Sequence, residues 1–261
     1  MRHRKYGRYG RYGYNAVFER ITEYGCSNPA TMKGVTKKTV LMLAIALIST
    51  LVCIKVVEPL DDLAAGMIYF GYLISPLLTF VLSLIMCINP SAAKTLAIPY
   101  SILEGVSIGS LAGLLTSVLG STGGLIVCLA FVITLSFFLG ASVLYYTGLV
   151  EVDSRLRRFG RVTLLGLCIS TLMITIIGLF NPLILDFFYG NTGFALIFAI
   201  ISVIIASVYS MISLDNAQVI VTAGVDKNYE WYASFGIVLN VIWLFWEVLR
   251  LVLIIFSRSD N

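Results

Sequence analysis

Seven apolar runs, each about long enough to cross a bilayer, divide this chain. They lie at residues 39–57, 65–88, 96–118, 124–147, 162–180, 193–214 and 232–256, with turn residues or charges between them. A helix needs about 20 apolar residues to cross the hydrocarbon core, and in lipid only helices and closed barrels satisfy their own backbone groups. The runs therefore predict an all-α polytopic membrane protein with seven transmembrane helices.

The composition supports a membrane class and excludes several kinds of chemistry. Of 261 residues, 59% are hydrophobic and 12% are charged, whereas soluble domains average about 45–50% and about 25%. The only histidine is His3, so histidine-ligated haem, a histidine-built metal site and a Ser/His/Asp triad each lack a required group. An S-x-x-K match at Ser91–Lys94 lies in a short connection without its partner motifs. We expect no enzyme, no cofactor and no metal site.

The distribution of basic residues predicts the orientation in the membrane. Nine of the 18 precede the first run, namely Arg2, Arg4, Lys5, Arg8, Arg11, Arg20, Lys33, Lys37 and Lys38. A second cluster follows the fourth run and comprises Arg155, Arg157, Arg158 and Arg161. The charged residues of the first connection are all acidic, namely Glu58, Asp61 and Asp62. The positive-inside rule then places the N-terminus in the cytoplasm and, after seven crossings, the C-terminus outside.

This orientation divides the chain into three parts. Residues 1–38 form a basic cytoplasmic tail that is partly disordered, residues 39–256 form the seven-helix transmembrane domain, and residues 257–261 form a short C-terminal tail. The tail repeats Arg-Tyr-Gly, a composition that keeps a segment flexible. The expected location is the cell membrane if the host is bacterial, and nucleic acid is not an expected partner.

The last apolar run carries polar residues at helical spacing. Asn240 and Glu247 are seven residues apart, so on a helix they share a face, about 10 Å apart along the axis. Arg250 follows Glu247 by three residues and can pair with it. A helix with such a stripe should face protein rather than lipid. A structural polar contact between helices and a functional site remain equally open.

Two further acids and a glycine pattern mark other runs. An ionisable group inside a span costs roughly 2.5–3.5 kcal/mol, so Glu104 in the third run and Asp215 at the end of the sixth each need a reason. Gly105, Gly109 and Gly113 recur every four residues, which favours close helix packing. Because Glu104 borders this glycine face, we expect it to be buried between helices near the other polar groups. Pro76 in the second run and Pro99 near the start of the third predict bends.

Several stretches together resemble a known family. They are "SNPATMKGVTKKTVLML", "IPYSILEGVSIG", "LYYTGLVEVDSRLRR", "LDNAQVI" and "YEWYASFGIVLNVIWLFWEVLRLV". Over about residues 27–256 they are similar to the Bax inhibitor-1-like family of integral membrane proteins, in its bacterial branch with an extended N-terminus. The resemblance implies two groups of three helices around a central seventh helix. It also implies a pH-sensitive calcium leak, controlled by one aspartate in the sixth helix and one in the seventh.

One of these two aspartates is replaced in this chain. The sixth-helix aspartate matches Asp215, but the seventh-helix position falls on Asn240. A neutral amide cannot share a proton as a second carboxylate does. Glu247 and Glu104 are the alternatives for the second acid, and the spacing does not choose between them.

Two functions follow from the resemblance. The first is a cation leak, with calcium or another cation as the transported ion, in which Asp215 gates the cytoplasmic mouth and Glu104, Asn240, Glu247 and Arg250 line or brace the interior. The alternative is a non-conducting regulator that binds other membrane proteins, such as a membrane-bound ATP-dependent protease. The lipid bilayer is a partner in both.

Overall fold

The computed structural model describes residues 28–57, 62–181, 183, 187, 188, 190 and 192–259. The Arg-Tyr-Gly repeat and the first-loop acids Glu58 and Asp61 lie outside the described residues. Within these ranges the chain is helical, and the only bridge recorded there is an isolated one between Pro29 and Asp226. The predicted all-α class is confirmed.

The helices follow the apolar runs in order. They are α2 (Met32–Val57), α3 (Asp62–Tyr69), the π-helical turn η1 (Phe70–Ile74), α4 (Ser75–Ile88), the 3₁₀ turn η2 (Pro90–Ala92), α5 (Ala93–Leu119), α6 (Ser121–Tyr146), α7 (Ser154–Phe180), α9 (Gly193–Thr222) and α10 (Tyr229–Ser259). The second run is therefore interrupted by η1, which ends just before Pro76. Proline lacks a backbone N–H and clashes with the carbonyl four residues earlier, so a wider turn relieves the backbone there.

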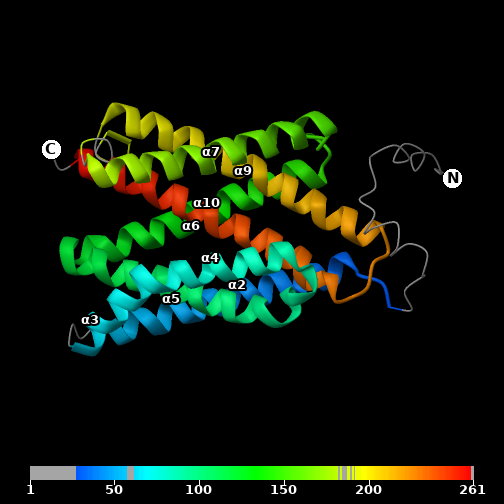
Figure 1. Ribbon diagram of the computed structural model, residues 1–261, viewed down its shortest axis with the longest axis horizontal. Helices are drawn as coiled ribbons and strands as arrows, with labels where there is room; N and C mark the ends of the chain where they lie inside the picture. The colour runs from blue at the N-terminus through cyan, green and yellow to red at the C-terminus, as the bar shows by residue number, and fades with distance from the viewer. Residues whose placement is uncertain are drawn as a thin grey trace.

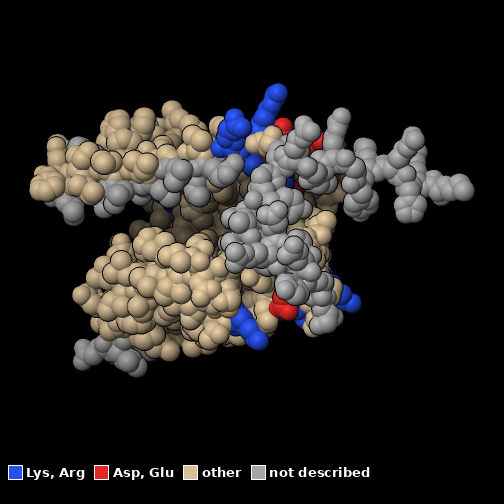
Figure 2. All heavy atoms as spheres, turned by 45° about the vertical axis from the view of Figure 1, so that its right-hand side comes forward, with Lys and Arg blue, Asp and Glu red and all other residues tan. Residues whose placement is uncertain are grey.

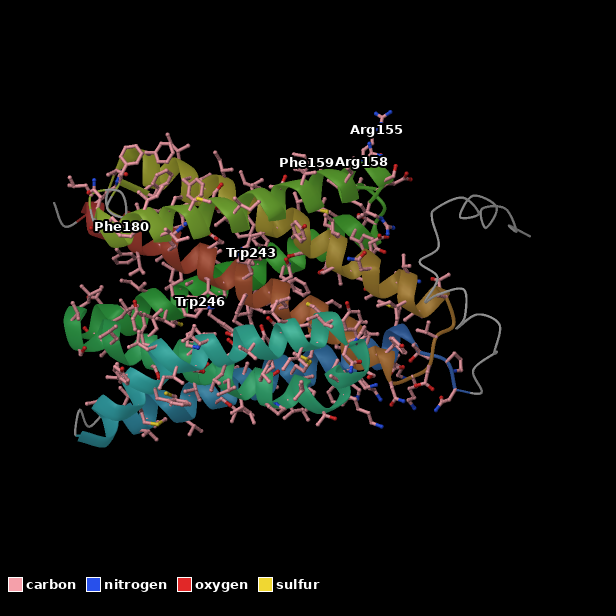
Figure 3. All side chains as sticks on the ribbon, in the orientation of Figure 1. Arg155, Arg158, Phe159, Phe180, Trp243 and Trp246 are labelled. Carbon is pink, nitrogen blue, oxygen red and sulfur yellow. The ribbon has the colours of Figure 1, made fainter. Side chains whose placement is uncertain are left out.

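Six spans among the described residues are long and apolar enough to cross a membrane. They are Met32–Val57, Ala65–Ile88, Pro90–Leu119, Ser121–Tyr146, Gly193–Thr222 and Tyr229–Arg258. These spans agree with a multi-pass integral membrane protein. The fifth predicted run lies within α7, which extends along the bundle from Arg155 at one end to Phe180 at the other (Figure 3). Helix α7 is not among the six, so a seventh crossing stays a prediction.

Helix α10 lies between two groups of helices (Figure 1). It packs against α2 and α5 on one side and against α6 and α9 on the other. In the first group α5 packs on α2 and α4, and in the second group α9 packs on α6 and α7. The start of α2 and the end of α10 lie at opposite ends of the bundle (Figure 1). The polar stripe of α10 is therefore sheltered within the protein.

The glycines of α5 lie directly against α2. A Cβ atom on Gly105 would overlap the carbonyl oxygen of Ala46, and one on Gly109 would lie 2.7 Å from Cβ of Cys53. A Cβ on Gly113 would overlap the side chain of Val57. Because real Cβ contacts are never this short, the three glycines allow two helix backbones to approach more closely than larger residues would permit.

Charge gathers at one end of the molecule, and the outer surface beyond it is largely free of charged side chains (Figure 2). That end holds the starts of α2, α5, α7 and α10, and its basic residues are Lys33, Lys37, Lys38, Lys94, Arg155, Arg157, Arg158 and Lys227. Large apolar side chains cover the outer faces elsewhere; Phe80, for example, is 61% exposed. This distribution suits a bundle whose sides contact lipid.

Candidate functional site: polar contacts around the central helix

The polar stripe of α10 faces α9. The side-chain amide of Asn240 donates a hydrogen bond to the Ser210 hydroxyl (2.8 Å) and lies 3.5 Å from the carbonyl oxygen of Ala206. The side-chain oxygen Oδ1 of Asn240 is buried without a hydrogen-bond partner among the described residues. One turn along α10, Trp243 packs edge-on against Tyr209 of α9 (5.6 Å between ring centroids). The seam between these two helices therefore combines aromatic packing with buried polar groups.

The same seam holds the pair formed by Glu247 and Arg250. Their carboxylate and guanidinium lie 2.8 Å apart, and the Trp243 indole N–H donates to the other Glu247 oxygen (3.3 Å). Arg250 also donates to the Ser202 hydroxyl of α9 (3.2 Å) and lies over the Phe198 ring at 5.1 Å. The opposite charges of Glu247 and Arg250 therefore balance each other. The contacts of Arg250 with α9 also stabilise the packing of α10 on α9.

Asp215 lies at the junction of three helices. It projects from α9, forms an ion pair with Arg157 of α7, and accepts a hydrogen bond from the Tyr145 hydroxyl of α6 (3.4 Å). Its side chain is only 14% exposed, so the ion pair is screened less by solvent than a surface pair. The junction lies at the end of the bundle where the described basic residues gather.

Local sequence explains how Arg157 reaches Asp215. The Asp153 carboxylate accepts a hydrogen bond from the Leu156 backbone N–H (2.8 Å), which caps α7 and sets the direction of its first turn. One turn later, a Cβ on Gly160 would lie 2.8 Å from the Ile212 side chain, so α7 approaches α9 closely at this glycine. Sequence reasoning missed Arg157 and Tyr145 as partners of Asp215, although the arginine cluster itself was the available signal. It also missed Gly160 as the point where α7 approaches α9.

The structure does not bring Asp215 and Asn240 into direct contact. Asn240 bonds to Ser210, which precedes Asp215 by five residues on α9, or about 7.5 Å along the helix axis. Asp215 is turned towards α6 and α7 instead. The two positions implied by the family resemblance therefore lie on one seam but have separate partners.

Glu104 is buried between helices, as expected, but on a different face of α10. It lines an open-sided pocket of about 230 Å³ together with residues of α4, α5 and α10, including Leu239 and Trp246. These two precede Asn240 and Glu247 by one residue each, which is about 100° around a helix. Trp243 and Trp246 accordingly leave α10 on different sides, towards α9 and towards α4 (Figure 3). Glu104 and the Glu247 pair thus belong to separate sites.

A further buried acid, Glu230, was not anticipated from the sequence. Its side chain is 1% exposed, forms an ion pair with Lys38, and accepts hydrogen bonds from the backbone N–H (2.9 Å) and hydroxyl (3.0 Å) of Thr31. Glu230 lies in the first turn of α10, where an acid complements the helix dipole. That position was the available signal. The contact ties the segment before α2 to the start of the central helix.

No group of three or more His, Cys, Asp or Glu side chains in the described part of the chain is arranged to hold a metal ion.

The comparisons with known proteins give one match. A family model described as "Bax inhibitor 1 like" matches residues 4–257. No curated protein and no solved structure matches the chain. The family match includes the Asp215 junction, the α9–α10 seam and the Glu104 pocket.

Proposed function

The chain belongs to the Bax inhibitor 1 like family, and from that premise we propose that it is a slow cation leak, with calcium as the cation and protonation as the control. The observation that carries the proposal is the ion pair between Asp215 and Arg157 at the basic end of the bundle. The proposal adopts the orientation that the positive-inside rule predicts. The basic end then faces the cytoplasm, the N-terminus is cytoplasmic and the C-terminus is external.

The ion pair is suited to hold the mouth closed. In the described part of the chain, α7 packs mainly on α9 and lies at the edge of the bundle (Figure 1). The groups that face Asp215 are the Arg157 guanidinium and the Tyr145 hydroxyl. Protonation of Asp215 removes its negative charge and its attraction to Arg157, so the start of α7 is freed from α9. Acid therefore opens the mouth, and neutral pH closes it.

The seam behind this mouth offers polar groups to a passing cation. Ser210 and Asn240 lie about 7.5 Å from the level of Asp215, and Glu247 lies about 10 Å beyond Asn240 along α10. Oxygen ligands such as carboxylates, amide carbonyls and hydroxyls suit calcium. Because Glu247 is paired with Arg250 in the closed form, conduction stays slow even when the mouth opens.

The pH dependence of calcium flux tests this gate. We expect wild-type protein in dye-loaded liposomes to pass more calcium at about pH 5 than at about pH 8, a range that a carboxylate in a protein can report. Asp215→Asn and Arg157→Gln each remove the ion pair, so both should leave the flux high and nearly independent of pH. The control is Arg158→Gln, which removes an exposed arginine from the same turn of α7 and should keep the wild-type response.

Two results would contradict the gate. A steep pH response that survives in both Asp215→Asn and Arg157→Gln would place the sensor elsewhere. Absence of calcium flux in the wild type and in every variant would reject the leak. The alternative of a non-conducting regulator of membrane proteins would then take its place.

Asn240→Asp tests whether the α9–α10 seam takes part in the gate. The substitution puts a second carboxylate within about two helical turns of Asp215, and like charges in a poorly solvated seam resist joint ionisation. We therefore expect the flux response to move towards neutral pH, measured in the same liposome assay. A curve that does not move, combined with loss of flux in Glu247→Gln, would assign control to the pair of Glu247 and Arg250.

A further inference from the structure

Polar and apolar side chains line a pocket around Glu104, and the proposed leak does not use this pocket. It lies between α4, α5 and α10 and has a volume of about 230 Å³. Glu104 is 8% exposed and lies near the middle of α5, about 16 Å from the start of that helix. The molecule is hollowed between its α4 half and its α7 half (Figure 2), and Trp246 reaches into the space between α10 and α4 (Figure 3).

The Glu104 carboxylate has no cationic partner in the described part of the chain. The groups beside it are the hydroxyls of Tyr100 and Thr79, and none of the described lysine or arginine side chains faces it. The Tyr100 hydroxyl is buried, lines the same pocket, and has no hydrogen-bond partner within bonding distance among the described residues. A buried acid normally pairs with a cation or a set of donors. An open site beside it therefore points to a ligand that supplies them.

The other polar groups of the pocket are set up to accept hydrogen bonds. The Thr79 hydroxyl donates its proton to the Pro76 carbonyl oxygen (3.0 Å). The single proton of the Ser107 hydroxyl goes to the Ser75 hydroxyl or to the Leu103 carbonyl oxygen, which both lie 3.0 Å away. Both oxygens thus keep lone pairs for a ligand, next to the carboxylate of Glu104. The pocket offers several acceptors and one donor, so its ligand should carry several N–H groups and a positive charge.

The residues that line the pocket favour an organic cation over a metal ion as its ligand. Calcium takes six to eight oxygen ligands, whereas this pocket supplies one carboxylate and no second acid. Apart from the uncharged Ser83, its remaining lining is apolar or aromatic and consists of Pro76, Phe80, Leu239 and Trp246. Aromatic rings attract organic ammonium groups. The pocket volume of about 230 Å³ equals that of about eight waters at roughly 30 Å³ each, which suits a small amine with a short alkyl chain.

We propose that the Glu104 pocket binds a primary alkylammonium ion, whose ammonium group bonds to Glu104 and Thr79 while its alkyl chain packs against Leu239 and Trp246. One carboxylate balances one positive charge, and three N–H groups match the acceptors. The site is independent of the Asp215 gate because it lies on another face of α10. Its failure would leave the proposed leak untouched.

Calorimetric titration of the full chain in non-ionic detergent tests the site, with n-hexylammonium chloride as the probe. We expect saturable binding at one site. Binding should weaken by about tenfold or more for hexyltrimethylammonium, which lacks N–H donors, and for hexanol, which lacks the charge. Glu104→Gln should weaken hexylammonium binding to a similar extent. The matched control is Glu247→Gln, which removes the carboxylate of the other intramembrane glutamate and should bind hexylammonium as the wild type does.

A second measurement needs no variant and so does not depend on the folding of Glu104→Gln. Dicyclohexylcarbodiimide reacts with carboxyl groups in apolar surroundings, and peptide mass spectrometry can report the rate at Glu104 and at Glu247 separately. Hexylammonium should slow the reaction at Glu104 and leave Glu247 unaffected. The proposal is overturned if hexanol binds as well as hexylammonium, if Glu104→Gln binds normally, or if hexylammonium protects neither glutamate or both equally.

Discussion

Gly105→Leu is expected to destabilise the folded protein by about 3 kcal/mol, the upper part of the usual range for an overpacked interior. Even a single Cβ atom at this position would overlap the carbonyl oxygen of Ala46, which is backbone and cannot rotate away. The nearby Ser49 side chain is also too close to accept it. The leucine must therefore separate α5 from α2, and that separation would also break the hydrogen bond from Thr50 to the Gly105 carbonyl oxygen (3.1 Å).

The matched control for this variant is Gly140→Leu in α6. No atom lies within 4 Å of a Cβ at Gly140, and leucine favours a helix over glycine by up to about 1 kcal/mol. Thermal unfolding in detergent, followed by circular dichroism, should therefore show a large drop for Gly105→Leu and little change or a small gain for Gly140→Leu. Equal melting temperatures for Gly105→Leu and the wild type would mean that α2 and α5 pack loosely.

Patterns within one helix are the part of this structure that the sequence predicts well. The apolar runs locate the helices, and four-residue spacing places Gly105, Gly109 and Gly113 on the face that meets α2. Three-residue spacing likewise predicts the ion pair of Glu247 and Arg250. In each case a fixed helical geometry converts separation along the chain into a direction in space. The ends of helices are predicted less accurately from the sequence. Helix α2 begins at Met32 rather than at residue 39, because hydropathy marks only the apolar part of a helix.

Contacts between helices are harder to predict because no fixed geometry links their sequence positions. Asp215 and Arg157 are 58 residues apart, and their pairing depends on where α7 crosses α9. The resemblance suggested Asn240 as the neighbour of Asp215, but the amide bonds to Ser210 instead. Glu104 shows the same limit: its burial follows from the glycine face, whereas its place on the α4 side of α10 depends on the packing of three helices.

Glu230→Gln is expected to cost about 3 kcal/mol of folding stability, near the lower end for breaking a buried ion pair by removing one partner. The substitution removes the charge opposite Lys38, whose side chain is 17% exposed and therefore only partly able to regain water. The Glu230 carboxylate lies directly against Gly34, where even a Cβ atom would overlap it. The amide of the glutamine must fit into the same narrow space. The loss would loosen the segment before α2 from the start of α10.

A double-mutant cycle separates the ion pair from the general packing of this region. Lys38→Met alone should destabilise the protein because Glu230 then remains buried without its cation, although both hydrogen bonds from Thr31 persist. The double variant should be less destabilised than the sum of the two single variants, since it leaves no unpaired charge. Lys37→Met, at the exposed neighbouring lysine, should change the melting temperature little. Strict additivity of Glu230→Gln and Lys38→Met would show that the two side chains do not interact. The segment before α10 would then be held by backbone contacts such as the hydrogen bond from Ala30 to Val225.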